Sequence, residues 1–148
     1  MNFDHILLMG YGAPARAEEV MPFLRSMSEG RGIPEKSLKT LAGHYELIGG
    51  ASPYNGQVLD FGECLAGELR MAGIDLPVFT GMKNWHPFLK DVLAGIHEKG
   101  FKKGLAIPLT PYRSASSGAG YEANLEFLFS SSGINNLKYQ FIEGWYSQ

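Results

Sequence analysis

Four short segments of the chain combine glycine with aromatic, hydroxyl or basic residues, the side chains that most often bind ligands or take part in reactions. They are residues 10–14 (GYGAP), 44–53 (HYELIGGASP), 81–88 (GMKNWHPF) and 110–121 (TPYRSASSGAGY). Glycine lets the backbone turn sharply or lie close to a bound molecule. These segments are therefore the first candidates for a binding site.

Tyr11 stands between two glycines, so the backbone can bend on both sides of it and leave the ring projecting. A projecting phenol could stack on a flat ligand or coordinate a metal. The same residues would also suit a tight turn in which the tyrosine covers the core. The segment is not a phosphate-binding loop, because the full GxGxxG spacing and the Lys-Ser/Thr pair are absent.

The other three segments each allow a functional and a structural interpretation. Ser52, before Pro53, is typical of a helix N-cap, and the glycines before it suit a joint between helices. His86 could act as a base or ligand, or could simply begin a helix. The hydroxyl-rich segment around Arg113 could bind an anion at a helix N-terminus, or could be a flexible loop.

Several kinds of catalytic site are missing from the sequence. The four histidines form no HxxxH or HExxH pair, and no serine lies in a GxSxG motif. Cys64 is the only cysteine, so neither an internal disulfide nor a cysteine-based metal cluster can form. Its position in an apolar helical stretch predicts a small core residue.

The length and composition indicate one globular domain over residues 1–148. Hydrophobic residues make up 45% and charged residues 19%, with a formal net charge of −2, which argues against a nucleic-acid partner. No apolar run is long enough to cross a membrane, and the first residues lack the pattern of a signal peptide. We therefore expect a cytoplasmic protein without a transmembrane segment.

Apolar runs alternate with amphipathic stretches, which predicts an α/β fold: a four-stranded parallel sheet, doubly wound, with helices on both faces. The expected strands are residues 5–10, 77–81, 104–109 and 139–145, the first and third buried on both faces. The expected helices are residues 17–28, 34–48, 52–73, 87–99 and 121–130. The strand that ends near Trp145 has no helix after it, which suits either a doubly wound domain that ends on a strand or a chain cut at a domain boundary.

The four segments, in this order and at these intervals, resemble the N-terminal half of a ferrochelatase, an enzyme that inserts ferrous iron into a porphyrin. Residues 6–14 (ILLMGYGAP), 48–53 (IGGASP), 85–88 (WHPF) and 107–112 (IPLTPY) carry the resemblance, which extends over nearly the whole chain. The resemblance implies a chelatase-like domain of four parallel strands. A second, similar domain would complete a cleft for the tetrapyrrole.

The resemblance also implies roles for individual residues. Tyr11 matches a position that faces the porphyrin metal in coproporphyrin-type enzymes, and is a candidate axial ligand to porphyrin iron. Ser52 and Tyr121 match positions near the porphyrin or its carboxylates. The porphyrin-binding residues carried over in this way are Tyr11, Arg31, His44, Tyr45, Ser52 and Tyr121. His44 stands where the coproporphyrin branch has arginine, and the basic patch near Arg31 is thinner than in the family.

The family's metal-inserting histidine, in an SxHSxP motif, and its partner glutamate belong to the second half, and this sequence contains no such motif. We therefore expect no catalytic residue and no cofactor in this chain, with ferrous iron as substrate. The expected partners are coproporphyrin III or protoporphyrin IX and a second chelatase domain. Two alternatives remain open: a half-size homodimer of the sirohydrochlorin cobaltochelatase type, whose members usually have histidine at the position of Tyr11, and a non-catalytic tetrapyrrole-binding domain.

Overall fold

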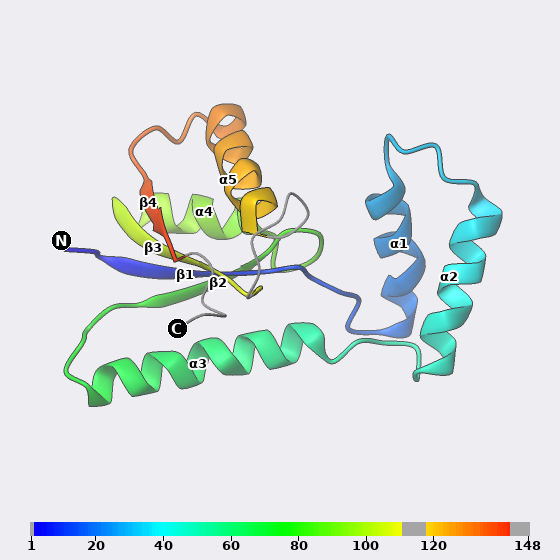
Figure 1. Ribbon diagram of the computed structural model, residues 1–148, viewed down its shortest axis with the longest axis horizontal. Coiled ribbons are helices and arrows are strands. Elements are labelled where there is room, and N and C mark those ends of the chain that lie inside the picture. The colour runs from blue at the N-terminus through cyan, green and yellow to red at the C-terminus, as the bar shows by residue number, and fades with distance from the viewer. Residues whose placement is uncertain (1, 111–117, 143–148) are drawn as a thin grey trace.

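The computed structural model describes residues 2–110 and 118–142, which form a four-stranded parallel sheet with flanking helices (Figure 1). The strands are β1 (His5–Gly10), β2 (Val78–Met82), β3 (Lys103–Pro108) and β4 (Lys138–Phe141), in the spatial order β2-β1-β3-β4. The helices are α1 (Ala17–Ser28), α2 (Glu35–Leu47), α3 (Tyr54–Met71), α4 (Leu89–Glu98) and α5 (Gly118–Ser132). The predicted fold class is confirmed. The predictions for Arg113 and Trp145 lie outside the described residues.

Helices cover both faces of the sheet because the direction of the crossovers reverses. The chain passes from β1 to β2 at one edge, and then past β1 to β3 and on to β4 at the other. Right-handed crossovers place helices on opposite faces when the direction changes in this way. On one face Leu7 and Met9 pack against Leu93 of α4 and Leu125 of α5, while α3 lies on the other.

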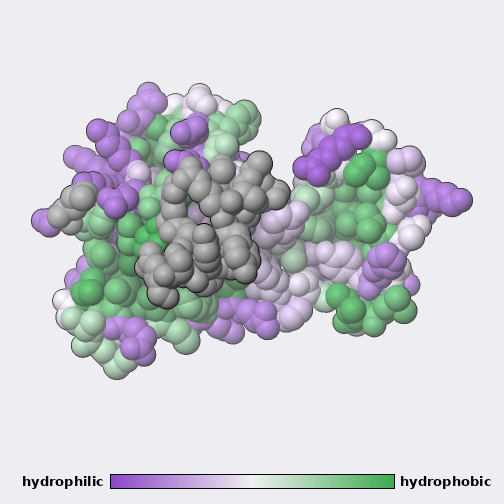
Figure 2. All heavy atoms as spheres, viewed as in Figure 1, coloured by the Kyte–Doolittle hydropathy of each residue, from purple (hydrophilic) through white to green (hydrophobic). Residues whose placement is uncertain are grey.

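The first two helices form a separate antiparallel hairpin that stands beside the sheet at the carboxyl end of β1 (Figure 1). Its small core consists of Val20, Phe23, Leu24 and Leu38. Figure 2 shows apolar side chains gathered on this hairpin, apart from the apolar surface over α3. The described residues therefore pack into two hydrophobic clusters. The α1–α2 hairpin forms one side of the site described below.

The fourth helix begins later than predicted, at Leu89, because the residues before it run along the edge of β2. The amide of Met82 donates to the carbonyl of Pro87 at 2.7 Å, and Phe88 forms a parallel bridge with Met82. His86 precedes a cis peptide bond to Pro87 and lies in this loop, so it does not begin the helix.

Two predictions are wrong on the side of the sheet that α3 covers: that the third strand is buried on both faces, and that Cys64 lies in the core. Alternate residues of β3 are only half-buried, because α3 packs against β2 and β1 and leaves part of β3 uncovered on that side. Along α3 the buried residues are Asn55, Val58 and Gly62, while Phe61 is 49% exposed. Cys64 is likewise exposed and not in the core, because it lies off this buried stripe.

Strand and helix ends otherwise differ from prediction by a few residues. β1 is buried along its whole length, as expected for the centre of a parallel sheet. The second helix ends, as predicted, before Gly49 and Gly50, both of which have positive φ angles. Among the described residues, no helix combines the length and apolarity that crossing a bilayer requires.

Candidate functional site

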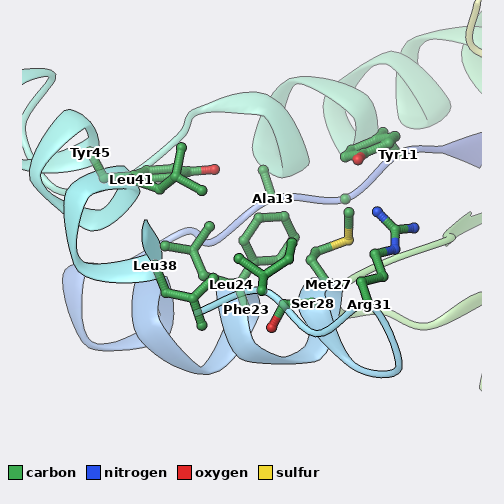
Figure 3. Close-up of a pocket in the computed structure, with 12 residues that line it drawn as sticks. Tyr11, Ala13, Phe23, Leu24, Met27, Ser28, Arg31, Leu38, Leu41 and Tyr45 are labelled. Atoms are coloured by element: carbon green, nitrogen blue, oxygen red, sulfur yellow. The ribbon is translucent and has the colours of Figure 1, made fainter. Parts of the chain in front are cut away.

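A pocket of about 340 Å³ lies between the α1–α2 hairpin and the segment that follows β1 (Figure 3). Its walls are mostly apolar, and the residues that line it are Tyr11, Gly12, Ala13, Phe23, Leu24, Met27, Ser28, Arg31, Ile33, Leu38, Leu41 and Tyr45. The position agrees with the general tendency of α/β proteins to bind ligands beyond the carboxyl ends of their strands.

Tyr11 stands at the rim of this pocket with its backbone held on both sides. Its amide donates to the hydroxyl of Tyr54 at 2.9 Å, and its carbonyl accepts from the Asn84 amide at 2.9 Å and from Asn84 Nδ2 at 3.0 Å. The side chain remains 46% exposed. The structure thus matches the projecting arrangement of this tyrosine and not the one in which it covers the core.

Asn55 fixes the next residues of the same segment from the start of α3. It accepts from the Ala13 amide at 2.9 Å and donates through Nδ2 to the carbonyls of Ala13 and His86, at 2.8 and 2.9 Å. This side chain is buried and joins α3, the segment after β1 and the loop after β2. The sequence motifs did not single out Asn55. Its place two residues after the helix-starting Pro53 was the only available signal.

Of the predicted site residues, Arg31 and Tyr45 line the pocket together with Tyr11. Figure 3 shows Arg31 at the same end of the pocket as Tyr11, with Leu38, Leu41 and Tyr45 toward the other end. Arg31 is exposed in the turn after α1, where its guanidinium could meet an anionic group at the rim. Burial, with a smaller contribution from nearby Tyr11, raises the pKa of the Tyr45 phenol.

The other three predicted residues do not line the pocket. Tyr121 is buried at the start of α5 beneath Lys83, whose Nζ lies 5.7 Å from the ring centroid. Burial is the main cause of its raised pKa, with smaller contributions from the neighbouring phenols of Tyr54 and Tyr11. Ser52 Oγ accepts from the Tyr54 amide at 3.3 Å, a contact that supports the start of α3. His44 lies exposed on α2.

Glu19 and Trp85 form a polar contact behind the pocket that sequence analysis also missed. Trp85 Nε1–H donates to Glu19 Oε2 at 2.9 Å, and the Ala15 amide donates to the same oxygen at 2.9 Å. These hydrogen bonds, with Trp85 as the largest cause, lower the pKa of the Glu19 carboxyl to about 2. A glutamate in the first turn of a helix is a recognisable capping signal, but its tryptophan partner is 66 residues away.

The described residues that line the pocket have the chemistry of a binding site. Aliphatic and aromatic walls suit a flat apolar body, the Tyr11 phenol can approach its face, and Arg31 can pair with a carboxylate at its edge. Within the described part of the chain, no group of three or more His, Cys, Asp or Glu side chains could hold a metal ion.

Comparison with known proteins decides the family. A family model for ferrochelatase matches residues 4–148. This chain belongs to the ferrochelatase family. The resemblance seen in the four loop segments is therefore confirmed over almost the whole chain.

Curated relatives are named coproporphyrin III ferrochelatases. The one from Leifsonia xyli subsp. xyli is 39% identical over 89% of this chain and 34% of its own length. Those from Mycolicibacterium smegmatis and Mycobacteroides abscessus are 35% and 42% identical, over 84% and 70% of this chain. The chain spans about a third of the length of these ferrochelatases.

Proposed function

We propose that this chain binds one face of a porphyrin in the Tyr11 pocket and so contributes one wall of a site for inserting ferrous iron, the metal substrate, in haem biosynthesis. The observation that carries the proposal is the placement of Tyr11 and Arg31 at one end of an apolar pocket beyond the carboxyl end of β1. The volume of about 340 Å³ is near the lower limit for small-molecule sites, so one face of a macrocycle would stay open to a second body.

In this proposal each part of the pocket has its own role. Phe23 and Leu24 present an apolar wall against which the ring can lie, and the Tyr11 phenol stands where it can meet the metal at the ring centre. Arg31 pairs with a peripheral carboxylate. Coproporphyrin III, with four propionates, suits this rim better than protoporphyrin IX, with two, and the relatives' names agree with that choice.

Metal insertion also needs a base that takes the protons of the pyrrole nitrogens. No histidine lines the pocket in the described structure, and His5 lies buried at the opposite end of β1. The proposal therefore assigns the base to the second chelatase domain, and we expect the chain alone to bind porphyrin without inserting metal.

Titration of the purified chain with coproporphyrin III, followed by porphyrin fluorescence, tests the proposal. Leu41→Glu adds a carboxylate to the pocket wall and should weaken binding at least tenfold, because it repels the propionates and is costly to cover with an apolar ring. Phe61→Glu is the matched control, because Phe61 is similarly exposed but lines a different apolar groove, beside α3. Absence of binding, or equal losses in both variants, would contradict the pocket assignment.

Light scattering and a zinc-insertion assay separate the alternatives. The proposal predicts a monomer without turnover. A dimer that inserts zinc would instead establish the half-size homodimeric chelatase. A non-catalytic binding domain is distinguished by ferric haem: tight haem binding that exceeds coproporphyrin III binding would favour that function over a role in insertion.

A further inference from the structure

Among the residues that the structure describes, Trp85 is the side chain from outside the α1–α2 hairpin that packs against the hairpin core, beside the two segments that connect the hairpin to the sheet and to α3. This residue belongs to the loop after β2, yet it packs against the hairpin core. Its ring meets Phe23 edge to face, with centroids 5.6 Å apart and planes at 88°. Its Nε1–H donates to Glu19 Oε2 on the first turn of α1 at 2.9 Å. Trp85 therefore contacts the hairpin through both an apolar face and a polar atom.

The backbone side of Trp85 lies against the segment that carries Tyr11. A Cβ atom on Gly12 would stand 2.7 Å from the Trp85 amide nitrogen and 3.2 Å from its Cβ, so only glycine permits this approach. The preceding residue, Asn84, holds the Tyr11 carbonyl through two hydrogen bonds. One short segment thus contacts both walls of the pocket: the Tyr11 segment and, through Trp85, helix α1.

Glu19 is well suited to anchor this contact. Its Oε2 accepts from Trp85 and from the Ala15 amide, and its Oε1 accepts from Arg16 Nε at 2.9 Å. The side chain is only 20% exposed, so water competes weakly for these bonds. Hydrogen bonds to a charged acceptor are stronger than those between neutral groups.

We infer that Trp85 and Glu19 are positioning residues, whose hydrogen bond sets the orientation of the α1–α2 hairpin and thereby the width of the porphyrin pocket between Phe23 and Tyr11. The inference rests on the proposed function for the identity of the ligand. Loss of the hydrogen bond leaves the hairpin core intact but frees the hairpin to rotate about its two connecting segments, so that the pocket is correctly shaped for only part of the time.

Four variants test this inference by titration with coproporphyrin III: Trp85→Phe, which keeps a ring but removes the donor, Glu19→Ala, Glu19→Gln, and the double variant Trp85→Phe/Glu19→Ala. We expect each of the first two to raise the dissociation constant about tenfold, the range open to a charged hydrogen bond. The double variant should lose less than the sum of the two single losses, because both substitutions remove the bond between Trp85 and Glu19. Glu19→Gln, which keeps an oxygen acceptor, should recover part of the affinity.

The stoichiometry of binding distinguishes positioning from loss of folded protein. Positioning raises the dissociation constant while one porphyrin still binds per chain. A fall in the number of binding sites with an unchanged dissociation constant would overturn the inference, and so would additive losses in the double variant.

A second measurement does not depend on the ligand. Spin labels on the native Cys64 of α3 and on a Lys36→Cys substitution in α2, both exposed positions, report the distance from hairpin to sheet. We expect one narrow distribution in the parent and a broad one in Trp85→Phe and Glu19→Ala. Arg25→Ala is the control, because it breaks a 2.7 Å ion pair to Glu35 inside the hairpin and leaves the Trp85 contact intact.

The two proposals fail in different ways. Unchanged distance distributions in Trp85→Phe and Glu19→Ala would overturn the positioning role, whatever binds. If the parent chain bound no coproporphyrin III, the proposed function would fail, while the spin-label distances would still decide whether Trp85 and Glu19 hold the hairpin.

Discussion

Two tyrosines show how the same side chain serves different purposes in this molecule. Tyr11 has its backbone fixed by Tyr54 and Asn84 while its side chain is 46% exposed, so its phenol is presented at the rim of the pocket. Tyr121 is 4% exposed and forms part of the main core. The phenol that can meet a ligand is therefore the one whose backbone, and not its ring, is held by neighbours.

The positive charge of Arg31 should attract a propionate of the porphyrin. Reversal of its charge in Arg31→Glu should weaken coproporphyrin III binding about fivefold to tenfold, because an attraction to a propionate becomes a repulsion. The loss should shrink as salt is added. Arg70→Glu, the same charge change on the exposed last turn of α3, is the matched control. Equal effects from both variants would show that only net charge matters.

At the scale of elements, α3 is held to the sheet through a glycine. A Cβ atom on Gly62 would stand 2.7 Å from Thr80 Oγ1 and 3.4 Å from Leu8 Cδ1, so helix and strand approach closely only because that atom is missing. This approach places the first turn of α3, with Tyr54 and Asn55, against the segments that form the pocket.

Two glycine-to-alanine changes in α3 should have opposite effects on stability. Gly62→Ala should lower the free energy of unfolding by about 1–3 kcal/mol, because the added methyl group overpacks the helix–sheet contact. Gly67→Ala, where nothing lies within 4 Å of the added atom, should raise it by about 0.5–1 kcal/mol through helix propensity. Urea denaturation measures both. A destabilised Gly67→Ala together with a neutral Gly62→Ala would contradict the close approach.

At the scale of the whole molecule, two hydrophobic clusters imply two levels of stability. The main core spans the sheet, α4 and α5, whereas the hairpin has four buried residues of its own. A small cluster opens more readily than a large one. Amide exchange should therefore be faster in α1 and α2 than in β1, which lies buried at the centre of the sheet.

Acid should loosen the hairpin before the sheet. The Glu19 pKa falls from its ordinary 4.5 to about 2 in the folded chain, so its contribution to stability is fully present above about pH 4.5 and is lost as the pH falls toward 2. Amide exchange in α1, followed between pH 5 and 2.5 and corrected for intrinsic rates, should accelerate over this interval. Glu19→Gln should remove most of that pH dependence, and an unchanged profile in the variant would refute the assignment to Glu19.

The molecule also exposes an apolar groove of about 530 Å³ between α3 and β3, lined by Phe61, Leu65, Ile107 and Ile142 among others. Parallel sheets are ordinarily covered on both faces, so this groove is an exposed apolar surface of an unusual kind. We expect a hydrophobic fluorescent dye to bind in it. Phe61→Glu should reduce dye fluorescence. Met71→Glu, which changes a methionine that is 76% exposed outside the groove, should not.

Local sequence patterns were enough to predict the α/β class and most elements. Period and capping residues are local signals: the apolar run of β1 predicted its complete burial, and the glycines at 49 and 50 predicted the end of α2. The position of Tyr11 between glycines left open whether its ring projects or covers the core, and the structure shows the projecting arrangement. The family resemblance then supplied Arg31 and Tyr45, which the structure places in the same pocket.

The contacts that shape the pocket were decided by the tertiary structure alone. Asn55 forms hydrogen bonds with Ala13 and His86, which lie 42 and 31 positions away along the chain, and Glu19 forms one with Trp85, 66 positions away. No periodicity or motif spacing carries information over such separations. The prediction that Cys64 lies in the core failed for the same reason, since the packing of α3 turns Gly62 toward the sheet and leaves Cys64 exposed. The sequence determined which segments become strands and helices, because those choices depend on neighbours along the chain. Only the packing of helices on the sheet determined which side chains meet.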